Sequence, residues 1–368
     1  MNLEKMNINR REFLKQTALL GGTASLGMAF PGIIMGKTKD DYTVRLGYYN
    51  CDHMTAAPIA KDAGIFDKLG LNVEVMGNGN VPQAMAAGKM DVGYIGFTGM
   101  VRGIMKGSPM ISVANNHAGG SMYIVTQPEI ETPEQLIGKK LGIGTDPEKN
   151  NAMWVWFAKS AGIPVEGKHY QCFAMSDKDE YLALKTKNLD GYNCCDPWGS
   201  MAEYEKTGKI MHGFGALPTG NWGYCCTLVM NKNFIKEHRE LAQKMVMAHM
   251  EAIQYIYTQP LKASQIFSKN YYVPEEVALM TIYKKTVGES RTLRWNITSD
   301  IYKEEINHHF DLGVLKTAPS FNETMTNELL TEVGAMDFDL FIKEKVDPIF
   351  PLALTYEDWK KKTLEQQS

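Results

Sequence analysis

The 368-residue chain lacks the short signatures of several common enzyme classes. It has no GxxxxGK[ST] phosphate loop, no HExxH helix, no GxSxG elbow and no paired carboxylates at a recognisable catalytic spacing. No apolar run reaches the ~18 residues that a membrane helix needs. A formal net charge of -3 provides no basic surface for nucleic acid. These absences favour a globular protein, of about two domains by length, that binds a small molecule rather than transforming it.

Cysteine is present, but its spacing suits neither disulfides nor a common metal motif. Five of the six cysteines fall at predicted strand ends, namely Cys51, Cys194, Cys195, Cys225 and Cys226. Adjacent cysteines form disulfides only with strained geometry, and neither pair has the C-x-x-C spacing of a metal loop. We therefore expect reduced, metal-free thiols and no cofactor. A metal site made from Cys194, Cys195, Cys225 and Cys226, with His53, is the alternative.

The N-terminus resembles a twin-arginine export signal. Arg10 and Arg11 are followed by Phe-Leu-Lys and by a weakly apolar stretch rich in glycine and alanine. The first cysteine is Cys51, so no lipid-anchoring cysteine follows the signal. We predict that residues 1–36 are a signal peptide, that the Tat translocase is a partner during export, and that the mature chain is periplasmic or extracytoplasmic.

An internal repeat sets the expected fold. The segment AKDAGI at residues 60–65 recurs as AKSAGI at residues 158–163, and flanking segments match in the same order. Each copy is predicted to form strand, loop, helix, strand, helix and strand. The fold class is therefore α/β, with two Rossmann-like lobes whose sheets are rich in parallel strands. We expect the chain to cross between the lobes at residues 121–126 and 224–231, and to be helical beyond residue 234.

The predicted ligand site lies beyond the carboxyl ends of the strands, where α/β sheets bind their ligands. Polar and aromatic residues gather at these strand ends and in the loops that follow them. The candidates are Asn50, His53, Thr55, Phe97, Thr98, Thr145, Asn150, Asn151, Asp196, Trp198, Trp222 and Tyr224. Helix capping is the alternative role for Thr55. Trp154 and Trp156 lie two residues apart on a predicted helix, so we expect one in the core and the other facing the cleft.

Four segments resemble the solute-binding proteins of the nitrate, sulfonate and taurine group of ABC importers, a group that includes pyrimidine-precursor binding and synthesis proteins. They are TAAPIAKDAGIFDKLGLNVEV (55–75), AMAAGKMDVGYIGFTG (84–99), PEQLIGKKLGIGT (133–145) and LDGYNCCDPW (189–198). The resemblance implies a type II-like periplasmic binding protein that closes by hinge motion on a small solute and delivers it to permease subunits.

The resemblance also implies a division of the chain. Residues 42–122 would begin the first lobe, residues 123–224 would form the second, and residues 225–368 would complete the first. We expect a monomer without enzymatic activity, binding a sulfonate-, taurine-, nitrate- or bicarbonate-like solute. A pyrimidine-precursor binding or synthase-like protein is one alternative, and a cysteine-ligated metal or cofactor protein is another. The Asp196 carboxylate argues against a bare anion as the only ligand.

Overall fold

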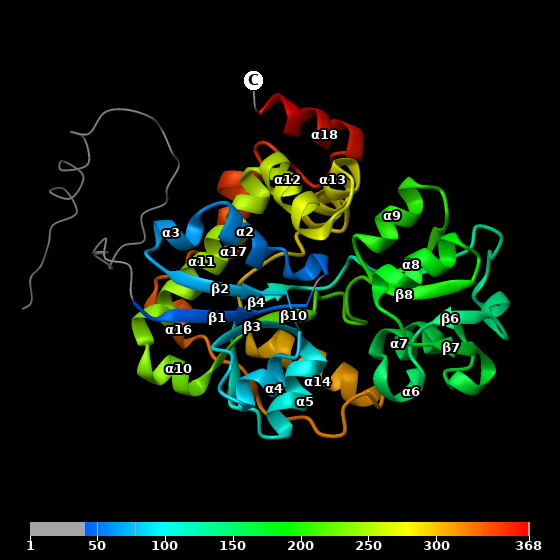
Figure 1. Ribbon diagram of the computed structural model, residues 1–368, viewed down its shortest axis with the longest axis horizontal. Coiled ribbons are helices and arrows are strands. Elements are labelled where there is room, and N and C mark those ends of the chain that lie inside the picture. The colour runs from blue at the N-terminus through cyan, green and yellow to red at the C-terminus, as the bar shows by residue number, and fades with distance from the viewer. Residues whose placement is uncertain (1–40, 50, 78, 367–368) are drawn as a thin grey trace, which may run out of the picture. The chain divides into compact units, whose positions relative to one another are not determined.

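Two five-stranded sheets organise the residues that the computed structural model describes, which are 41–49, 51–77 and 79–366 (Figure 1). The predicted signal peptide, residues 1–36, and the ligand-binding candidate Asn50 lie outside these residues. The strand orders are β2-β1-β3-β10-β4 and β7-β6-β8-β5-β9. The strands are β1 (Thr43–Gly47), β2 (Asn72–Met76), β3 (Val92–Gly96), β4 (Met110–His117), β5 (Met122–Thr126), β6 (Lys140–Gly142), β7 (Gln171–Phe173), β8 (Gly191–Cys195), β9 (Lys209–Gly213) and β10 (Cys226–Asn231).

The two sheets share one topology. β1 pairs in parallel with β2 and β3, and β6 pairs in parallel with β7 and β8. Each sheet then contains one antiparallel strand, which is β10 between β3 and β4 in the first sheet and β5 between β8 and β9 in the second. All other strands of each sheet run in a common direction. The α/β fold with parallel-rich sheets, predicted from the repeat, is confirmed.

The segments predicted to cross between the lobes are instead strands. Residues 121–126 contain β5 of the second sheet, and residues 224–231 contain β10 of the first sheet. An extended apolar segment has the same sequence pattern whether it connects two sheets or pairs within one. The predicted positions of both connections between the lobes were therefore wrong. The chain passes between the sheets in residues 118–121 and 214–225. Gly119 and Gly120 adopt positive φ angles of 95° and 73° in the first of these passages.

In both copies a helix follows each of the three parallel strands. The first copy contains α2 (Ala56–Asp62), α3 (Ile65–Lys68), α4 (Val81–Ala86) and α5 (Phe97–Met105), and the second contains α6 (Pro147–Asn150), α7 (Ala152–Ala161), α8 (Asp177–Lys185) and α9 (Trp198–Tyr204). Gly64 follows α2 with φ 73°, and Gly162 ends α7 with φ 70°. The matched glycines therefore end their helices in the left-handed conformation that the repeat predicted.

The chain beyond β10 is helical, as predicted. Its helices are α10 (Lys232–Glu237), α11 (Arg239–Thr258), α12 (Pro260–Tyr271), α13 (Glu275–Tyr283), α14 (Ser299–Asp311), α15 (Phe321–Thr324), α16 (Glu328–Glu332), α17 (Phe338–Phe341) and α18 (Tyr356–Glu365). Short 3-10 or π turns span Asp52–Met54, Pro133–Leu136, Gly167–His169, Lys284–Gly288 and Ile342–Val346. The stripe of α11 that contains Leu241, Met245 and Ala252 is buried, as its spacing predicted. Within the described residues, no helix is both long and apolar enough to cross a bilayer.

Candidate functional site

A cavity of about 480 Å³ lies at the carboxyl ends of strands from both sheets. Its walls come from the end of β3 and the start of α5, the loop after β6, the start of α7, the end of β8 and the passage before β10. This is the position that the topology of α/β sheets favours for a ligand. Six predicted ligand-binding residues line it, namely His53, Phe97, Thr98, Asn150, Asn151 and Tyr224.

Two polar candidates have structural partners instead of facing the cavity. The Thr55 hydroxyl donates a hydrogen bond to the carbonyl of Asp52, within its own helix start. The Asp196 carboxylate is fully buried and accepts hydrogen bonds from the Ser200 backbone N–H at 2.8 Å and hydroxyl at 2.7 Å. Asp196 therefore secures the first turn of α9 and does not line the cavity as the sequence suggested.

The remaining candidates also lie outside the cavity wall. Trp198 belongs to the core of the second sheet, where its ring lies 5.8 Å from that of Tyr181. Trp222 packs over Gly119, since a Cβ on that glycine would lie 3.1 Å from the indole. Thr145 is exposed in the loop after β6. A residue that follows a strand thus lies near the cavity, but its side chain can point in another direction.

Three carboxyl groups line the cavity that the sequence analysis did not single out: Asp177, Glu180 and Glu305. Asp177 accepts a hydrogen bond from the backbone N–H of Cys195 at 3.1 Å, so it is tied to the end of β8. Glu305 lies 2.7 Å from the His309 imidazole one helical turn away on α14. The position of Glu305 could not be predicted, because α14 follows the repeat by many residues and carries no matching segment.

Burial raises the pKa of two of these carboxyl groups. It raises the pKa of Glu180 to about 10, with added repulsion from Asp177 and Asp179, so this group is neutral at pH 7. Burial also raises the pKa of Asp177, although the backbone N–H of Cys195 opposes the shift. No lysine or arginine is among the described residues that line the cavity. A bare oxyanion would therefore meet carboxyl groups without a cationic side chain beside them.

An aromatic and apolar wall faces these polar groups. The Phe97 ring stacks against Tyr224 at 6.1 Å and against His309 at 5.9 Å. Trp156 lines the cavity, whereas Trp154 is fully buried and donates a hydrogen bond from its indole to the Val165 carbonyl at 2.9 Å. The predicted division of the two tryptophans, with one in the core and the other facing the cleft, is confirmed. The cavity thus combines flat apolar surfaces with hydrogen-bonding groups, as small-molecule sites do.

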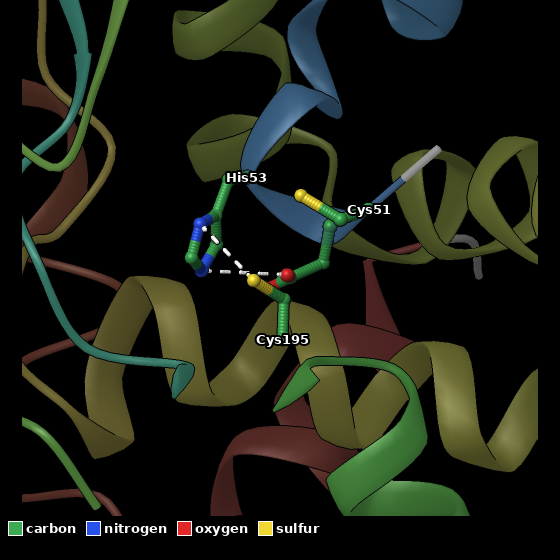
Figure 2. A group of neighbouring side chains, drawn as sticks. Cys51, His53 and Cys195 are labelled. Atoms are coloured by element: carbon green, nitrogen blue, oxygen red, sulfur yellow. Dashed lines mark hydrogen bonds and ion pairs between the residues drawn. The ribbon is translucent and has the colours of Figure 1, made fainter. Parts of the chain in front are cut away.

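A cluster of thiols surrounds His53 at one end of the cavity, and we call Cys51, His53, Cys195, Cys225 and Cys226 the thiol cluster. Figure 2 shows the Cys195 thiol pointing toward the His53 ring. The His53 Nδ1 atom lies 3.4 Å from the Cys225 sulfur, 3.6 Å from that of Cys226 and 3.7 Å from that of Cys195. The Cys225 and Cys226 sulfurs are 3.5 Å apart. All six cysteines are free thiols.

The opposite edge of the His53 ring contacts polar groups of the protein. Its Nε2 atom lies 3.2 Å from the Ser121 carbonyl oxygen and 3.5 Å from the Asp52 carboxylate. The ring stacks on His117 with centroids 4.0 Å apart. Asp52 also forms a fully buried ion pair with Lys285 at 2.9 Å. Burial lowers the pKa of His53, with a further contribution from the Lys285 charge, so the imidazole is neutral at pH 7.

Two sheets of matching topology with a ligand-sized cavity between their strand ends define the periplasmic binding protein class of fold. The chain matches the model of the NMT1-like family over residues 37–268, which is more than half of its length, and it belongs to that family. The comparison with curated proteins finds no match.

Solved structures of this fold cover most of the chain at low identity. A zinc-bound ligand-binding component of an ABC-type import system from Staphylococcus aureus is 17% identical, with a TM-score of 0.63, covering 79% of this chain and 98% of its own. The alkanesulfonate-binding protein SsuA from Xanthomonas axonopodis pv. citri is 12% identical, with a TM-score of 0.63 and coverages of 77% and 98%. The nitrate-binding protein NrtA from Synechocystis PCC 6803 is 16% identical, with a TM-score of 0.62 and coverages of 87% and 97%. These similarities support the fold.

Proposed function

We propose that the protein is the extracytoplasmic solute-binding component of an ABC importer. It captures one small solute per chain in the cavity and presents it to permease subunits, after export by the Tat translocase. The family match and the cavity between the two sheets support this function. A sheet on each side of the cavity, joined by two passages of chain, suits capture by hinge closure.

The cavity favours a solute that carries both a nitrogen donor and an acceptor group. Asp177, Glu180 and Glu305 offer oxygen atoms to an amine or ring N–H, and no lysine or arginine lines the described wall to balance a bare anion. The first turns of α5 and α7 also line the cavity, and the positive ends of these helices favour an acceptor atom such as a sulfonate oxygen. Taurine has both groups, and an aminopyrimidine has both on a flat ring that suits Phe97 and Tyr224.

Isothermal titration calorimetry with five solutes tests this proposal. Taurine, an aminopyrimidine, an alkanesulfonate, nitrate and bicarbonate are each titrated into the purified mature protein. We expect binding by at least one of the two nitrogen-bearing solutes and none by nitrate or bicarbonate alone. A Glu305→Gln variant should weaken binding, whereas Glu129→Gln, at an exposed turn, should leave it unchanged. Tight binding of nitrate with no response to taurine or the aminopyrimidine would contradict the proposed solute class.

A further inference from the structure

The thiol cluster has the donor atoms and the spacing of a tetrahedral metal site. Zinc binds thiolate sulfur at ~2.3 Å and imidazole nitrogen at ~2.0–2.1 Å, so a tetrahedral site separates sulfur from nitrogen by about 3.5 Å and sulfur from sulfur by about 3.8 Å. The three measured nitrogen-to-sulfur distances run from 3.4 to 3.7 Å, and the Cys225 and Cys226 sulfurs are 3.5 Å apart. These four separations are close to those of a tetrahedral site.

The His53 ring is oriented as metal-binding histidines are. Ligating imidazoles generally use one nitrogen for the metal and donate the other N–H to a carbonyl or carboxylate, which fixes the ring. In this protein Nε2 faces the Ser121 carbonyl and the Asp52 carboxylate, so Nδ1 is the atom left to face the three thiols. Ordinary packing of a buried histidine does not require three sulfur atoms around its second nitrogen.

A second imidazole adds an independent observation. His117 is fully buried, and neither of its ring nitrogens has a hydrogen-bond partner among the described residues. Its ligand atom lies within 4.8 Å of those of His53 and Cys225. An unpaired buried polar group costs free energy unless something binds it, so this ring indicates a missing partner beside the cluster.

The lack of C-x-x-C spacing does not exclude a metal site in the folded chain. C-x-x-C spacing is needed only where one loop supplies two ligands, whereas these donors come from the turn after β1, the end of β8 and the start of β10. Cys225 precedes β10 and a register shift follows Cys226, so the two adjacent thiols are not held to opposite faces of a regular strand. Cys194, which the sequence grouped with them, is buried in the core of the second sheet instead.

We propose that His53, Cys195, Cys225 and Cys226 bind one thiophilic metal ion, Zn²⁺ or Cu⁺, at the end of the cavity. Thiolate ligands select these two ions over the hard cations Mg²⁺ and Ca²⁺. On binding, the metal replaces the protons of the thiols that ligate it, and those protons pass to solvent. The site goes beyond the proposed solute function and does not depend on it, because its ligands are present without a solute.

Metal loading of the purified mature protein tests this site. Protein freed of metal by a chelator under reducing conditions is titrated with Co²⁺, then with Zn²⁺ or Cu⁺, in the absence of any solute. We expect one equivalent of Co²⁺ per chain, with a thiolate-to-cobalt charge-transfer band and the visible bands of tetrahedral cobalt. Zn²⁺ or Cu⁺ should displace the cobalt and abolish these bands, and elemental analysis should identify which ion the cell supplies.

Single substitutions assign the ligands. Cys195→Ser, Cys225→Ser and Cys226→Ser should each weaken metal binding by more than the ~10–100-fold that loss of a supporting contact costs. Cys172→Ser is the matched control, because that thiol donates to the Gly167 carbonyl at 3.4 Å on β7, away from the cluster. Circular dichroism confirms that each variant folds, and any variant that does not is replaced by alanine at the same position.

Two results would overturn the proposal. One is the absence of a stoichiometric cobalt spectrum in the reduced wild-type protein. The other is equal metal affinity in the wild type, Cys195→Ser and Cys225→Ser. Since no solute is present in these titrations, a failure of the calorimetric solute panel would leave this result unaffected.

Discussion

Glu180 is a carboxyl group that its surroundings keep protonated. It packs directly against Gly142, where a Cβ atom would lie 2.7 Å from the carboxyl, and burial raises its pKa to about 10. In the unfolded chain the same group ionises near pH 4.5. Between these two values the unfolded state loses a proton that the folded state keeps, so this residue lowers the stability of the protein as the pH rises.

We predict that Glu180→Gln reduces the pH dependence of stability. The amide is close in size to the protonated acid and has no proton to lose, so the variant should gain stability relative to the wild type as pH rises above about 5. The limit for one proton is about 1.4 kcal/mol per pH unit. Urea unfolding at pH 5, 6, 7 and 8 measures this difference, with the exposed Glu129→Gln as control. Parallel profiles for the wild type and Glu180→Gln would show that Glu180 is ionised at neutral pH.

Gly223 is required by the close approach of Glu305. A Cβ atom at Gly223 would lie 1.6 Å from a Glu305 carboxylate oxygen and 3.0 Å from Leu217. The Glu305 side chain would have to move and give up its 2.7 Å contact with His309. Both residues line the cavity, so the displaced carboxylate would change its shape and charge.

Gly223→Ala should therefore destabilise the protein by about 1–3 kcal/mol, the usual cost of overpacking, and weaken solute binding. Gly215→Ala is the matched control, because Gly215 also lines the cavity but a Cβ there meets no atom within 4 Å. Thermal unfolding and calorimetric titration of both variants measure the two effects. If the two variants behaved alike, the contact between Gly223 and Glu305 would have no energetic role.

At the scale of the element, the strand ends show which features of the site can be predicted from the sequence and which cannot. The alternation within β8 places Cys194 in the core and Cys195 at the cavity, yet the sequence analysis treated the two as one pair. The same limit applies at the start of α9, where the preceding Asp196 caps the first turn and Trp198 packs into the core. Position along the chain predicted which strand ends meet, but side-chain direction depends on packing partners that are distant in sequence.

Helix α7 carries two tryptophans with different environments, which allows closure to be followed. Trp156 lines the cavity, and Trp154 is buried with its indole bonded to Val165. We predict that solute binding changes the fluorescence of the wild type and of Trp154→Phe, and that Trp156→Phe loses most of the change. Trp198 and Trp222, which the sequence analysis placed among the ligand-binding candidates, do not line the cavity. A full fluorescence change in Trp156→Phe would mean that another tryptophan reports solute binding.

At the scale of the whole molecule, the repeat predicted the three parallel strands of each sheet because their residues lie in matched order along a short stretch of chain. It could not predict that β10 enters the first sheet or that β5 enters the second, since pairing with a distant strand leaves no local pattern. For the same reason, the sequence did not predict which residues form the thiol cluster. Cys51 joins the cluster, and His117 lies beside it, only because the fold brings separate strand ends together.

The helical C-terminal region also reaches back to the first passage between the sheets through Glu289. One oxygen of its carboxylate accepts a hydrogen bond from the Tyr123 hydroxyl at 2.6 Å. The other accepts from both the backbone N–H and the hydroxyl of Ser121, the latter at 3.3 Å. Three donors from residues 121–123 thus converge on one side chain that follows α13, so Glu289 links the C-terminal region to the first passage between the sheets.

Glu289→Gln should break this link. In either orientation of the amide, its NH₂ group faces a donor that the carboxylate had accepted, and leaving such a group unpaired costs about 1–3 kcal/mol. We expect the urea midpoint to fall by a corresponding amount with an unchanged slope, and solute affinity to fall as well, because the second sheet is less firmly positioned.

Tyr123→Phe, which removes one donor and leaves the carboxylate in place, should have a smaller effect on both the midpoint and the affinity. The exposed Glu237→Gln serves as the control. An unchanged midpoint in Glu289→Gln would mean that the passage between the sheets is held by the backbone pairing of β5 alone.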